Sequence, residues 1–381
     1  MIELGADRGA PEPPRRRPTS RRWRVAGALL ACALLGAAAP PAPLPVSSGP
    51  PLPPRAALLA AGTLVLTVDP DADPPVLTAY DADAPRLPAR WRVPVTPAAG
   101  WSAEPAGELL LVAERDPVRQ VVATTARSAR TGEPRWRRDD RVYAAGDGAV
   151  AVTEVRSVTD PGRRVEGAVR GVDVTDGATR WSVPLPSTAV LAVLPGTPGR
   201  VLVLRDDGLA RVYDVRDGTV RGEGRLPPAD YAPDNPQVVG AYVVLRHPVA
   251  GGAELVGYDL PGLVPRWRVP VDRETTVQPC AGLLCGQDGR DRWALVPAGG
   301  ARAWTWPGGA GWRAVPGSGD VRPLLRAADR DGRRHLVSTV GPHGPRVVGV
   351  LPAGVRDCRA AGAVLMCRDA DGRLAAWSIR G

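Results

Sequence analysis

The sequence predicts an all-β protein built from short repeated strands, and the spacing of its tryptophans is the main reason. Trp91, Trp136 and Trp181 are spaced by 45 residues. Trp267 follows 86 residues later, which is twice 43. Between them lie alternating or β-branched runs such as 75–80, and helical periodicity is almost absent after residue 55. Self-similarity at about 40–45 residues is typical of β-propeller blades.

The composition agrees with many short strands. The chain has 381 residues, enough for one large repeat domain, and 44% of them are apolar, enough to bury a core. Gly (44) and Pro (43) are abundant. Short strands joined by Gly/Pro turns account for the apolar content and the turn residues together.

The first 24 residues form an Arg-rich tail, which we expect in the cytoplasm. They hold seven Arg against Glu3, Asp7 and Glu12, a net charge of +4, and the remaining 42 Arg and 37 acids add +5 to reach +9. The chain has no Lys and no Phe, a bias typical of GC-rich genomes such as those of actinobacteria. Beyond the tail both signs are interspersed, without a basic stripe interleaved with aromatic residues, so no nucleic-acid partner is predicted.

An apolar segment at 25–46 is predicted to be a transmembrane helix or a signal segment. Its fifteen uncharged residues 25–39 fall short of the about 20 that span a bilayer, and counting on to Val46 adds crowded prolines. Arginines before it predict that the rest of the chain lies outside. We expect a single-pass anchor. A cleaved signal peptide ending near Ala39 and lipid attachment at Cys32 stay open as alternatives.

Residues 47–55 are predicted to be a Pro-rich linker. From Pro40 to Arg55 the chain contains too much Pro for a helix or a central strand. We therefore expect an extended spacer that holds the next domain, 56–381, away from the membrane.

Aligning the turns divides 56–381 into eight repeats. The turn position that ideally holds Asp falls at Asp81, Ser128, Asp173, Asp214, Asp259, Val296, Val340 and Ser378. Asp caps such a turn through its side chain, while Gly supplies positive φ. In the strand that follows, a large and rigid indole is predicted to fill the gap between neighbouring blades, at Trp91, Trp136, Trp181, Trp267 and Trp304.

These repeats predict a single propeller of eight four-stranded blades. Eight repeats give roughly 41 residues per blade. Seven blades is the alternative, because the repeats at Val296 and Val340 are weak. The last repeat stops at Gly381, before its Trp strand. We expect the segment after Arg55 to supply that strand, because closing the ring removes free sheet edges.

Four cysteines outside the apolar segment fall in two local pairs, Cys280 with Cys285 and Cys358 with Cys367. Each pair brackets small and aliphatic residues, so each is predicted to form a disulfide between neighbouring strands of one blade. Disulfides agree with export to an oxidising compartment. A four-Cys zinc site and free thiols are the alternatives, although the spacing fits zinc ribbons poorly.

The repeat resembles the Ala-x-Asp-x-x-Thr-Gly-x-x-x-Trp docking motif of the PQQ-like, quinoprotein-type β-propellers. Residues 126–136, 171–181 and 257–267 carry the resemblance, which extends over about 56–381 in degenerate form. The motif occurs in quinoprotein dehydrogenases, which hold PQQ and calcium on the propeller axis. It also occurs in non-enzymatic relatives, such as the eight-bladed lipoprotein that assists outer-membrane protein assembly.

The resemblance to the enzymes stops at the residues of their site. A quinoprotein site implies a calcium cage of Glu, Asn and Asp, a catalytic Asp and an adjacent Cys-Cys pair. This chain has a single Asn, Asn235, and no adjacent cysteines. We therefore expect no catalytic, cofactor-binding or metal-binding residues, and no PQQ or calcium. His247, His335 and His343 are expected in surface loops, and Asp69–Asp73 in a solvated turn.

The sequence thus predicts a non-catalytic exported β-propeller that acts as a binding or scaffold module at the cell envelope. It would be a single-pass membrane protein with the propeller outside, or else secreted or lipid-anchored, and its partner would be a protein or another envelope component. The alternative is a degenerate PQQ-dependent quinoprotein or sugar-processing enzyme with a site in the central channel. Trp306 and Trp312 lie outside the repeat register, so one of them is expected in an exposed patch.

Overall fold

The computed structural model describes residues 46–379 except 82–83, 85, 117–121, 156–163, 187, 195, 197, 227–233, 290, 308–310, 319–322 and 328–333. Within these residues the chain forms strands and no α-helix, which confirms the all-β prediction. The tail 1–24 and the apolar segment 25–46, apart from Val46, lie outside the described residues. None of the described segments is a helix with the length and hydropathy that crossing a bilayer requires.

The strands form antiparallel sheets, counted here as four-stranded groups and numbered as blades in chain order. Blade 1 consists of β2 (Ala57–Ala61), β3 (Leu64–Asp69), β4 (Val76–Asp81) and β5 (Ala89–Pro94). Blade 2 consists of β6 (Gly100–Ala106), β7 (Leu109–Arg115), β8 (Val122–Ser128) and β9 (Pro134–Arg138). Blade 3 consists of β10 (Arg141–Ala145), β11 (Gly148–Val155), β12 (Arg164–Val172) and β13 (Thr179–Pro184). Blade 4 consists of β14 (Ala189–Leu194), β15 (Arg200–Arg205), β16 (Leu209–Asp214) and β17 (Val220–Arg225).

The second half of the chain continues the same order. Blade 5 consists of β18 (Asp234–Val239), β19 (Tyr242–Val249), β20 (Gly252–Asp259) and β21 (Pro265–Val271). Blade 6 consists of β22 (Val277–Cys280), β23 (Leu283–Asp288), β24 (Asp291–Leu295) and β25 (Arg302–Trp306). Blade 7 consists of β26 (Arg313–Ala314), β28 (Leu324–Ala327), β29 (His335–Gly341) and β30 (Gly344–Leu351). Blade 8 consists of β31 (Arg356–Ala361), β32 (Val364–Arg368), β33 (Arg373–Ser378) and β1 (Val46–Pro51), with the two-residue β27 (Gly317–Ser318) beside β31.

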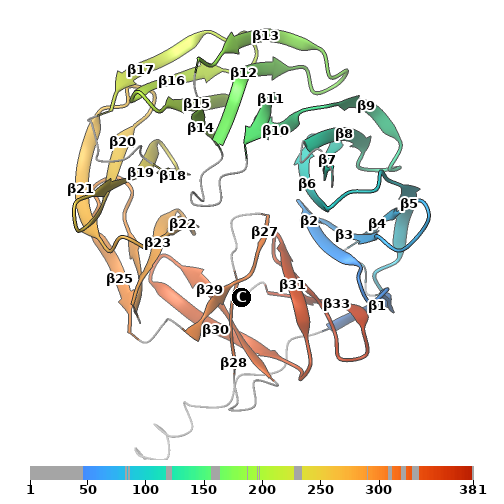
Figure 1. Cartoon of the computed structure of the whole chain (residues 1–381). Helices are drawn as coiled ribbons and strands as arrows, with labels where there is room; N and C mark the ends of the chain where they lie inside the picture. The colour runs from blue at the N-terminus through green and yellow to red at the C-terminus, as the bar shows by residue number, and fades with distance from the viewer. Residues whose placement is uncertain are drawn as a thin grey trace, which may run out of the picture. The chain divides into compact units, whose positions relative to one another are not determined.

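The blades surround a common centre, and the first strands of blades 1 to 6 lie nearest to it (Figure 1). Contacts join the first strands in order from β2 through β6, β10, β14 and β18 to β22, and β31 contacts β2 again. A short pairing of β12 with β14 merges blades 3 and 4 into one larger sheet. The described residues therefore form a β-propeller of seven to eight blades.

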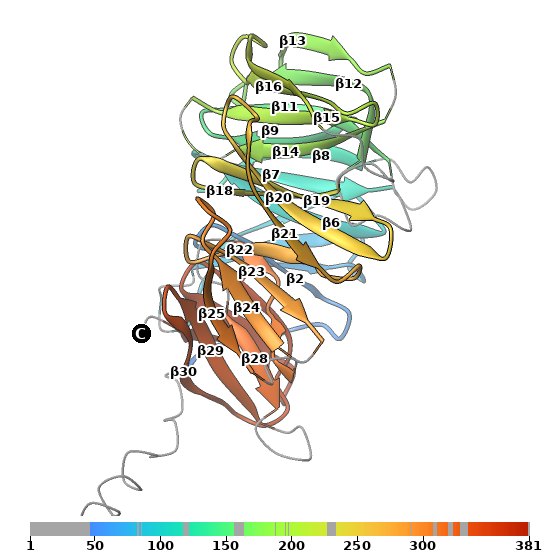
Figure 2. The same cartoon turned by 90° about the vertical axis from the view of Figure 1, so that its left-hand side faces the viewer.

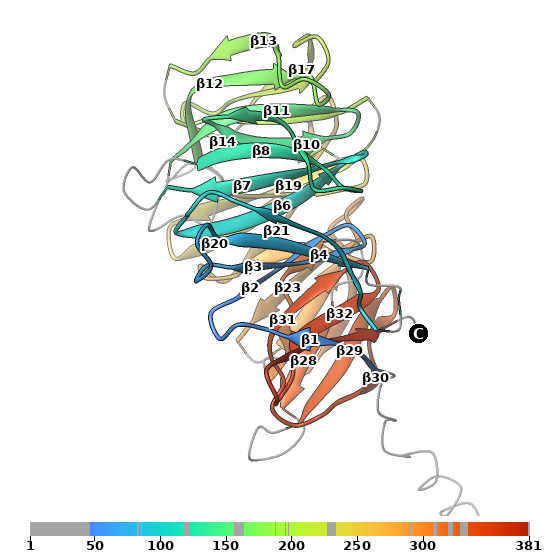
Figure 3. The same ribbon diagram turned by 90° about the vertical axis from the view of Figure 1, so that its right-hand side faces the viewer.

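The ring has two faces, which differ in the turns that lie on them. The strands run across the thickness of the ring, with turns on both sides (Figures 2 and 3). We call the strands of a blade A to D from the centre outwards. The turns that join A to B and C to D lie on one face, which we call the AB–CD face. Because neighbouring strands are antiparallel, the other turns lie on the opposite face.

The hydrophobic core lies between neighbouring blades. One cluster joins Leu202 and Val212 of blade 4 to Val243 and Leu245 of blade 5, and all four are buried. Equivalent clusters lie at the other contacts between blades. Strand residues alternate between the two sides of a sheet, so each blade contributes to the cores on both of its sides.

The N-terminal strand of the structure corrects two predictions. β1 (Val46–Pro51) pairs with β33 and completes blade 8, with Val46 opposite Trp377. The strand that closes the ring thus precedes Arg55, whereas we expected the segment after Arg55 to supply it. The predicted linker 47–55 is partly this strand. Its prolines are tolerated because β1 is an edge strand, where a missing backbone N–H breaks no ladder.

The prediction that Trp306 or Trp312 is exposed is wrong, because Trp312 is only 2% exposed and Trp306 is not exposed either. The ring centroid of Trp312 lies 4.9 Å from that of Trp306, and its carbonyl oxygen accepts a hydrogen bond from Arg292. Trp306 is half-buried. The expected exposed tryptophan patch is therefore part of the packing between blades 6 and 7.

Candidate functional site

Three predicted turn aspartates, Asp173, Asp214 and Asp259, each accept two bonds on the AB–CD face, one from a backbone N–H of the turn and one from an Arg. In blade 3, Oδ1 of Asp173 accepts from the backbone N–H of Thr175 at 2.8 Å, and Oδ2 accepts from Arg180 at 2.5 Å. The Thr175 hydroxyl and the Arg180 guanidinium hold the pKa of Asp173 at about 2. The same ion pair recurs between Asp81 and Arg90, Asp214 and Arg221, and Asp259 and Arg266.

The predicted tryptophans lie on D strands and cover the C–D turn of the next blade. Trp136 donates its indole N–H to the carbonyl oxygen of Val174 at 2.8 Å. A Cβ on Gly177 would lie 2.8 Å from that indole ring. The same indole-to-carbonyl bond is made by Trp91, Trp181 and Trp267, at 3.0, 2.7 and 2.6 Å. Trp304 is half-buried, and its indole N–H has no hydrogen-bond partner among the described residues.

Small residues on the C strand make room for these indoles. Gly171 lies opposite Trp181, and a Cβ on Gly171 would lie 2.0 Å from the indole nitrogen. Where Gly222 replaces the tryptophan in blade 4, the larger Val212 stands opposite it. The backbone of Pro261 in blade 5 then approaches so closely that a Cβ on Gly222 would lie 1.9 Å from its carbonyl oxygen.

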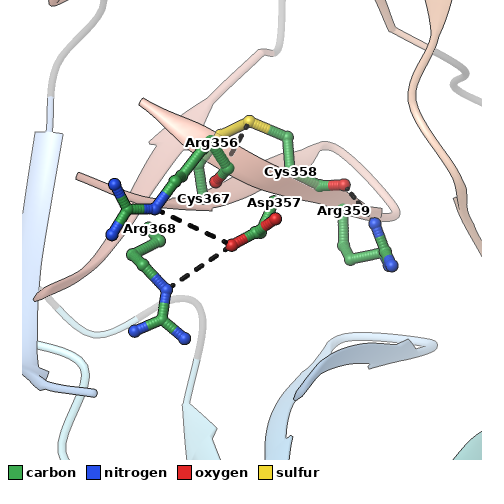
Figure 4. The surroundings of a disulfide bond; sticks show 6 residues. All are labelled: Arg356, Asp357, Cys358, Arg359, Cys367 and Arg368. Atoms are coloured by element: carbon green, nitrogen blue, oxygen red, sulfur yellow. Dashed lines mark hydrogen bonds and ion pairs between the residues drawn. A yellow bond between two sulfur atoms is a disulfide. The ribbon is translucent and has the colours of Figure 1, made fainter. Parts of the chain in front are cut away.

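The four predicted cysteines form two disulfides. Cys280 bonds with Cys285 between β22 and β23, and Cys358 bonds with Cys367 between β31 and β32. Each joins strands A and B of one blade, which confirms the predicted staples. Figure 4 shows the second disulfide beside Asp357, whose carboxylate lies between Arg356 and Arg368.

The histidines lie in three different settings. His247 is buried in β19, so its predicted position in a surface loop is wrong. Its Nε2 lies 2.9 Å from the Tyr258 hydroxyl. Burial, with a smaller contribution from the charge of Arg268, lowers the pKa of His247 to about 4. His335 begins strand β29 and is half-buried, so its predicted position in a surface loop is also wrong. His343 lies exposed in the turn between β29 and β30, as expected.

The residues weighed for metal or cofactor chemistry have local structural contacts. Asp69 caps its own turn by accepting from the backbone N–H of Asp71 at 3.1 Å, and Asp71 forms an ion pair with Arg55. The amide of Asn235 donates to the carbonyl oxygen of Val277 and accepts from Gln237, linking blades 5 and 6. Across the described ranges, no group of three or more His, Cys, Asp or Glu side chains is placed to hold a metal ion.

A groove on the AB–CD face was not predicted. Its volume is about 820 Å³, and turns of blades 2 and 3 line it together with one side chain of blade 1. Its charged and hydroxyl-bearing lining includes Arg90, Glu108, Ser128, Arg130, Arg135, Asp147 and Thr175.

Local turn geometry positions the groove's acidic side chains. The A–B turns of blades 2 and 3 are two-residue turns that begin with Gly107 and Gly146, both at φ of 60°. Positive φ at this position is what glycine permits, and the next residue then projects from the face. Those next residues are Glu108 and Asp147, which are both exposed.

One sequence signal for this groove was present. Ser128 replaces the turn Asp in blade 2, while Arg135 stays at the position of its usual ion-pair partner. A mismatch of this kind is visible once the repeats are aligned. The alignment does not show which side chains lie around Ser128 and Arg135, because that depends on how blades 2 and 3 pack.

Comparison with known proteins identifies the fold. No protein-family model and no curated protein matches the sequence. BamB from Moraxella catarrhalis superposes with a TM-score of 0.52 and 16% identity, over 85% of this chain and 93% of BamB. The computationally designed protein Ika8 superposes with a TM-score of 0.58 and 11% identity, over 87% of this chain and 99% of Ika8.

A quinohemoprotein alcohol dehydrogenase from Comamonas testosteroni superposes with a TM-score of 0.45 and 14% identity, over 74% of this chain and 64% of the enzyme. That score is too low to support an argument about function. Identities this low show the fold alone. The chain therefore has a β-propeller fold similar to that of BamB.

Proposed function

We propose that this protein is a non-catalytic exported β-propeller that binds a protein partner, as a binding or scaffold module at the cell envelope. The groove on the AB–CD face is the observation that carries the proposal. It is large enough for a peptide segment, and it is lined by exposed charged side chains on hydrogen-bonded turns. A rigid frame that presents adaptable side chains suits recognition, because propellers bind through loops placed on the fold.

The proposed location outside the cytoplasm rests on the disulfides. Two disulfides in one chain favour an oxidising compartment. We further propose a single-pass anchor at 25–46 with the propeller outside. Secretion or a lipid anchor are the other forms of the same location. The segment lies outside the described residues. The proposed anchor therefore rests on the arginines that precede it and on the length of its uncharged run.

The proposal includes a ring of eight blades. The strand pairings among the described residues form eight groups of four, and β1 supplies the outer strand of blade 8. Completing the last blade with a strand from the other end of the chain joins the two ends and leaves no open gap in the ring.

We also propose that the protein is not an enzyme and holds neither PQQ nor calcium. The contacts of Asn235 support this, because both ends of its amide already bond to neighbouring residues. A thermal-shift assay with PQQ plus calcium tests it. We expect no change in melting temperature. A clear rise would favour the quinoprotein alternative, because a ligand at about 100 times its dissociation constant adds about 2.7 kcal/mol of stability.

Site-specific crosslinking tests the binding role. A photoreactive residue replaces Thr175, which is exposed in the groove, or Ala250, which is exposed in a B–C turn on the opposite face. We expect one discrete protein adduct from the Thr175 position in cell envelopes and none from the Ala250 position. Equal labelling at both positions, or none at either, would contradict a partner at this groove.

A further inference from the structure

Among the residues that the structure describes, two arginines in the groove lack the ion-pair partners that equivalent arginines have elsewhere in the ring. Arg130 and Arg135 are both exposed. Across the described residues, neither side chain forms a hydrogen bond or an ion pair. The repeats act as an internal control, because they show what these positions contact when a partner is present.

Arg135 has lost its partner on its own blade. In blades 3, 4 and 5 the turn Asp accepts from the Arg seven residues later, as Asp173 accepts from Arg180. In blade 2 the turn residue is Ser128. Its hydroxyl oxygen still accepts from the backbone N–H of Thr131 at 3.2 Å. The serine therefore preserves the turn and removes the negative charge, which leaves the Arg135 guanidinium uncompensated.

Arg130 has lost a partner on the preceding blade. Its equivalent in blade 4 is Arg216, which also lies two residues after the turn position. Arg216 forms an ion pair with Asp147 in the A–B turn of blade 3. The same place in the A–B turn of blade 1 is Thr63, between the paired residues Ala61 and Leu64. A hydroxyl there cannot neutralise Arg130.

The remaining charges of the groove leave one positive charge in excess. Arg90 is neutralised by Asp81, and Asp147 is neutralised by Arg216. Glu108 is the single carboxylate of the lining without a described ion pair, set against the two free guanidinium groups. Guanidinium groups bind carboxylates through paired, charge-assisted hydrogen bonds.

We propose that Arg130 and Arg135 form the recognition site for an acidic segment of the protein partner, a stretch with at least two Asp or Glu side chains. This inference rests on the proposed function and names the chemistry of its ligand. A groove recessed between turns fits an extended chain better than the flat surface of a bilayer. Charge excess and concave shape therefore favour a peptide over anionic lipid headgroups.

The test measures binding of fluorescein-labelled hexaglutamate to the full-length protein by fluorescence polarisation, with hexaglutamine as the uncharged comparison. Replacing both arginines, Arg130→Ala with Arg135→Ala, should weaken hexaglutamate binding about tenfold or more, because each removes charge-assisted hydrogen bonds. Added salt should weaken binding to the unmodified protein. Hexaglutamine should not bind.

Ser128→Asp is the sharper variant, because it retains both arginines. It introduces the residue that blades 3 to 5 have at this turn, and it should restore the internal ion pair of Arg135 and weaken hexaglutamate binding. Glu108→Gln should strengthen binding by removing the opposing charge. Arg266→Ala is the matched control, since Arg266 is exposed but already pairs with Asp259. Its affinity for hexaglutamate should be unchanged.

Three results would overturn the inference. They are equal affinity in all variants, no binding of hexaglutamate by the unmodified protein, or Arg-dependent binding of phosphatidylglycerol vesicles without hexaglutamate binding. Crosslinking separates this failure from failure of the proposed function. If the Thr175 adduct persists in the Arg130→Ala/Arg135→Ala variant, a partner binds the groove by other contacts. If the adduct is also absent from the unmodified protein, the proposed function fails with it.

Discussion

Arg368 donates a hydrogen bond to the carbonyl oxygen of Pro53 at 2.9 Å, across 315 residues of sequence. The same guanidinium donates to the carbonyl oxygens of Leu52 and Ala56, at 3.2 and 3.0 Å. Arg368 belongs to the B strand of blade 8, while residues 52–56 connect β1 to the first strand of blade 1. One buried side chain thus holds the segment through which the ring closes.

Removing this contact should destabilise the whole ring. Arg368→Ala leaves three backbone acceptors at a buried position without their donor, and we expect the free energy of unfolding to fall by about 2–4 kcal/mol. Chemical denaturation measures it. Arg373→Ala is the control, because Arg373 is exposed on the neighbouring strand β33 and should change stability by less than about 0.5 kcal/mol. Equal losses in both variants would show that the Arg368 contact does not stabilise the closure.

The contact between Trp136 and Gly177 can be isolated with a pair of glycine variants. Gly177 and Gly251 have similar φ, 75° and 82°, so alanine pays a similar conformational cost at both positions. Only at Gly177 would the new Cβ meet an indole, at 2.8 Å, whereas nothing lies within 4 Å at Gly251. Thermal melts should show Gly177→Ala less stable than Gly251→Ala by about 1–3 kcal/mol. Equal stability of the two variants would mean that the Trp136 indole can move away from the new Cβ without loss of stability.

Trp312 should behave as a core residue. Its ring is buried against Trp306, so Trp312→Ala creates a large cavity and should cost about 3–5 kcal/mol in the free energy of unfolding. Val347→Ala provides the comparison, because Val347 is 40% exposed and its truncation should be nearly neutral. A small effect at Trp312 would contradict its buried position.

His247 should make stability depend on pH. Its folded pKa of about 4 lies below the ordinary value of 6.5, so the unfolded chain binds a proton that the folded chain rejects. The contribution is complete above pH 6.5 and is lost as the pH falls towards 4, by an amount on the order of 3 kcal/mol.

Denaturation curves between pH 7 and 4 measure this loss. His247→Gln should remove most of the slope, because glutamine does not titrate and can still bond to the Tyr258 hydroxyl. His343→Gln should leave the slope unchanged, since His343 is exposed in a turn. If both variants show the same dependence of unfolding free energy on pH as the unmodified protein, His247 does not cause that dependence.

The repeat was predictable because its contacts are local. A turn Asp and its Arg lie seven residues apart in blades 3 to 5, and the cysteines pair at separations of 5 and 9. Such contacts remain visible as sequence spacing. They sufficed for the all-β class, the turns at Asp173, Asp214 and Asp259, and both disulfides.

The sequence by itself therefore determined the blade, and the tertiary structure decided what happens between blades. The burial of Trp312 and His247, the closure by β1 and the clamp by Arg368 all depend on segments that meet only in the assembled ring. The free charges of Arg130 and Arg135 have the same origin. Ser128 marks a missing partner in the sequence, but only packing against the turns of blades 1 and 3 shows that no other described residue replaces it.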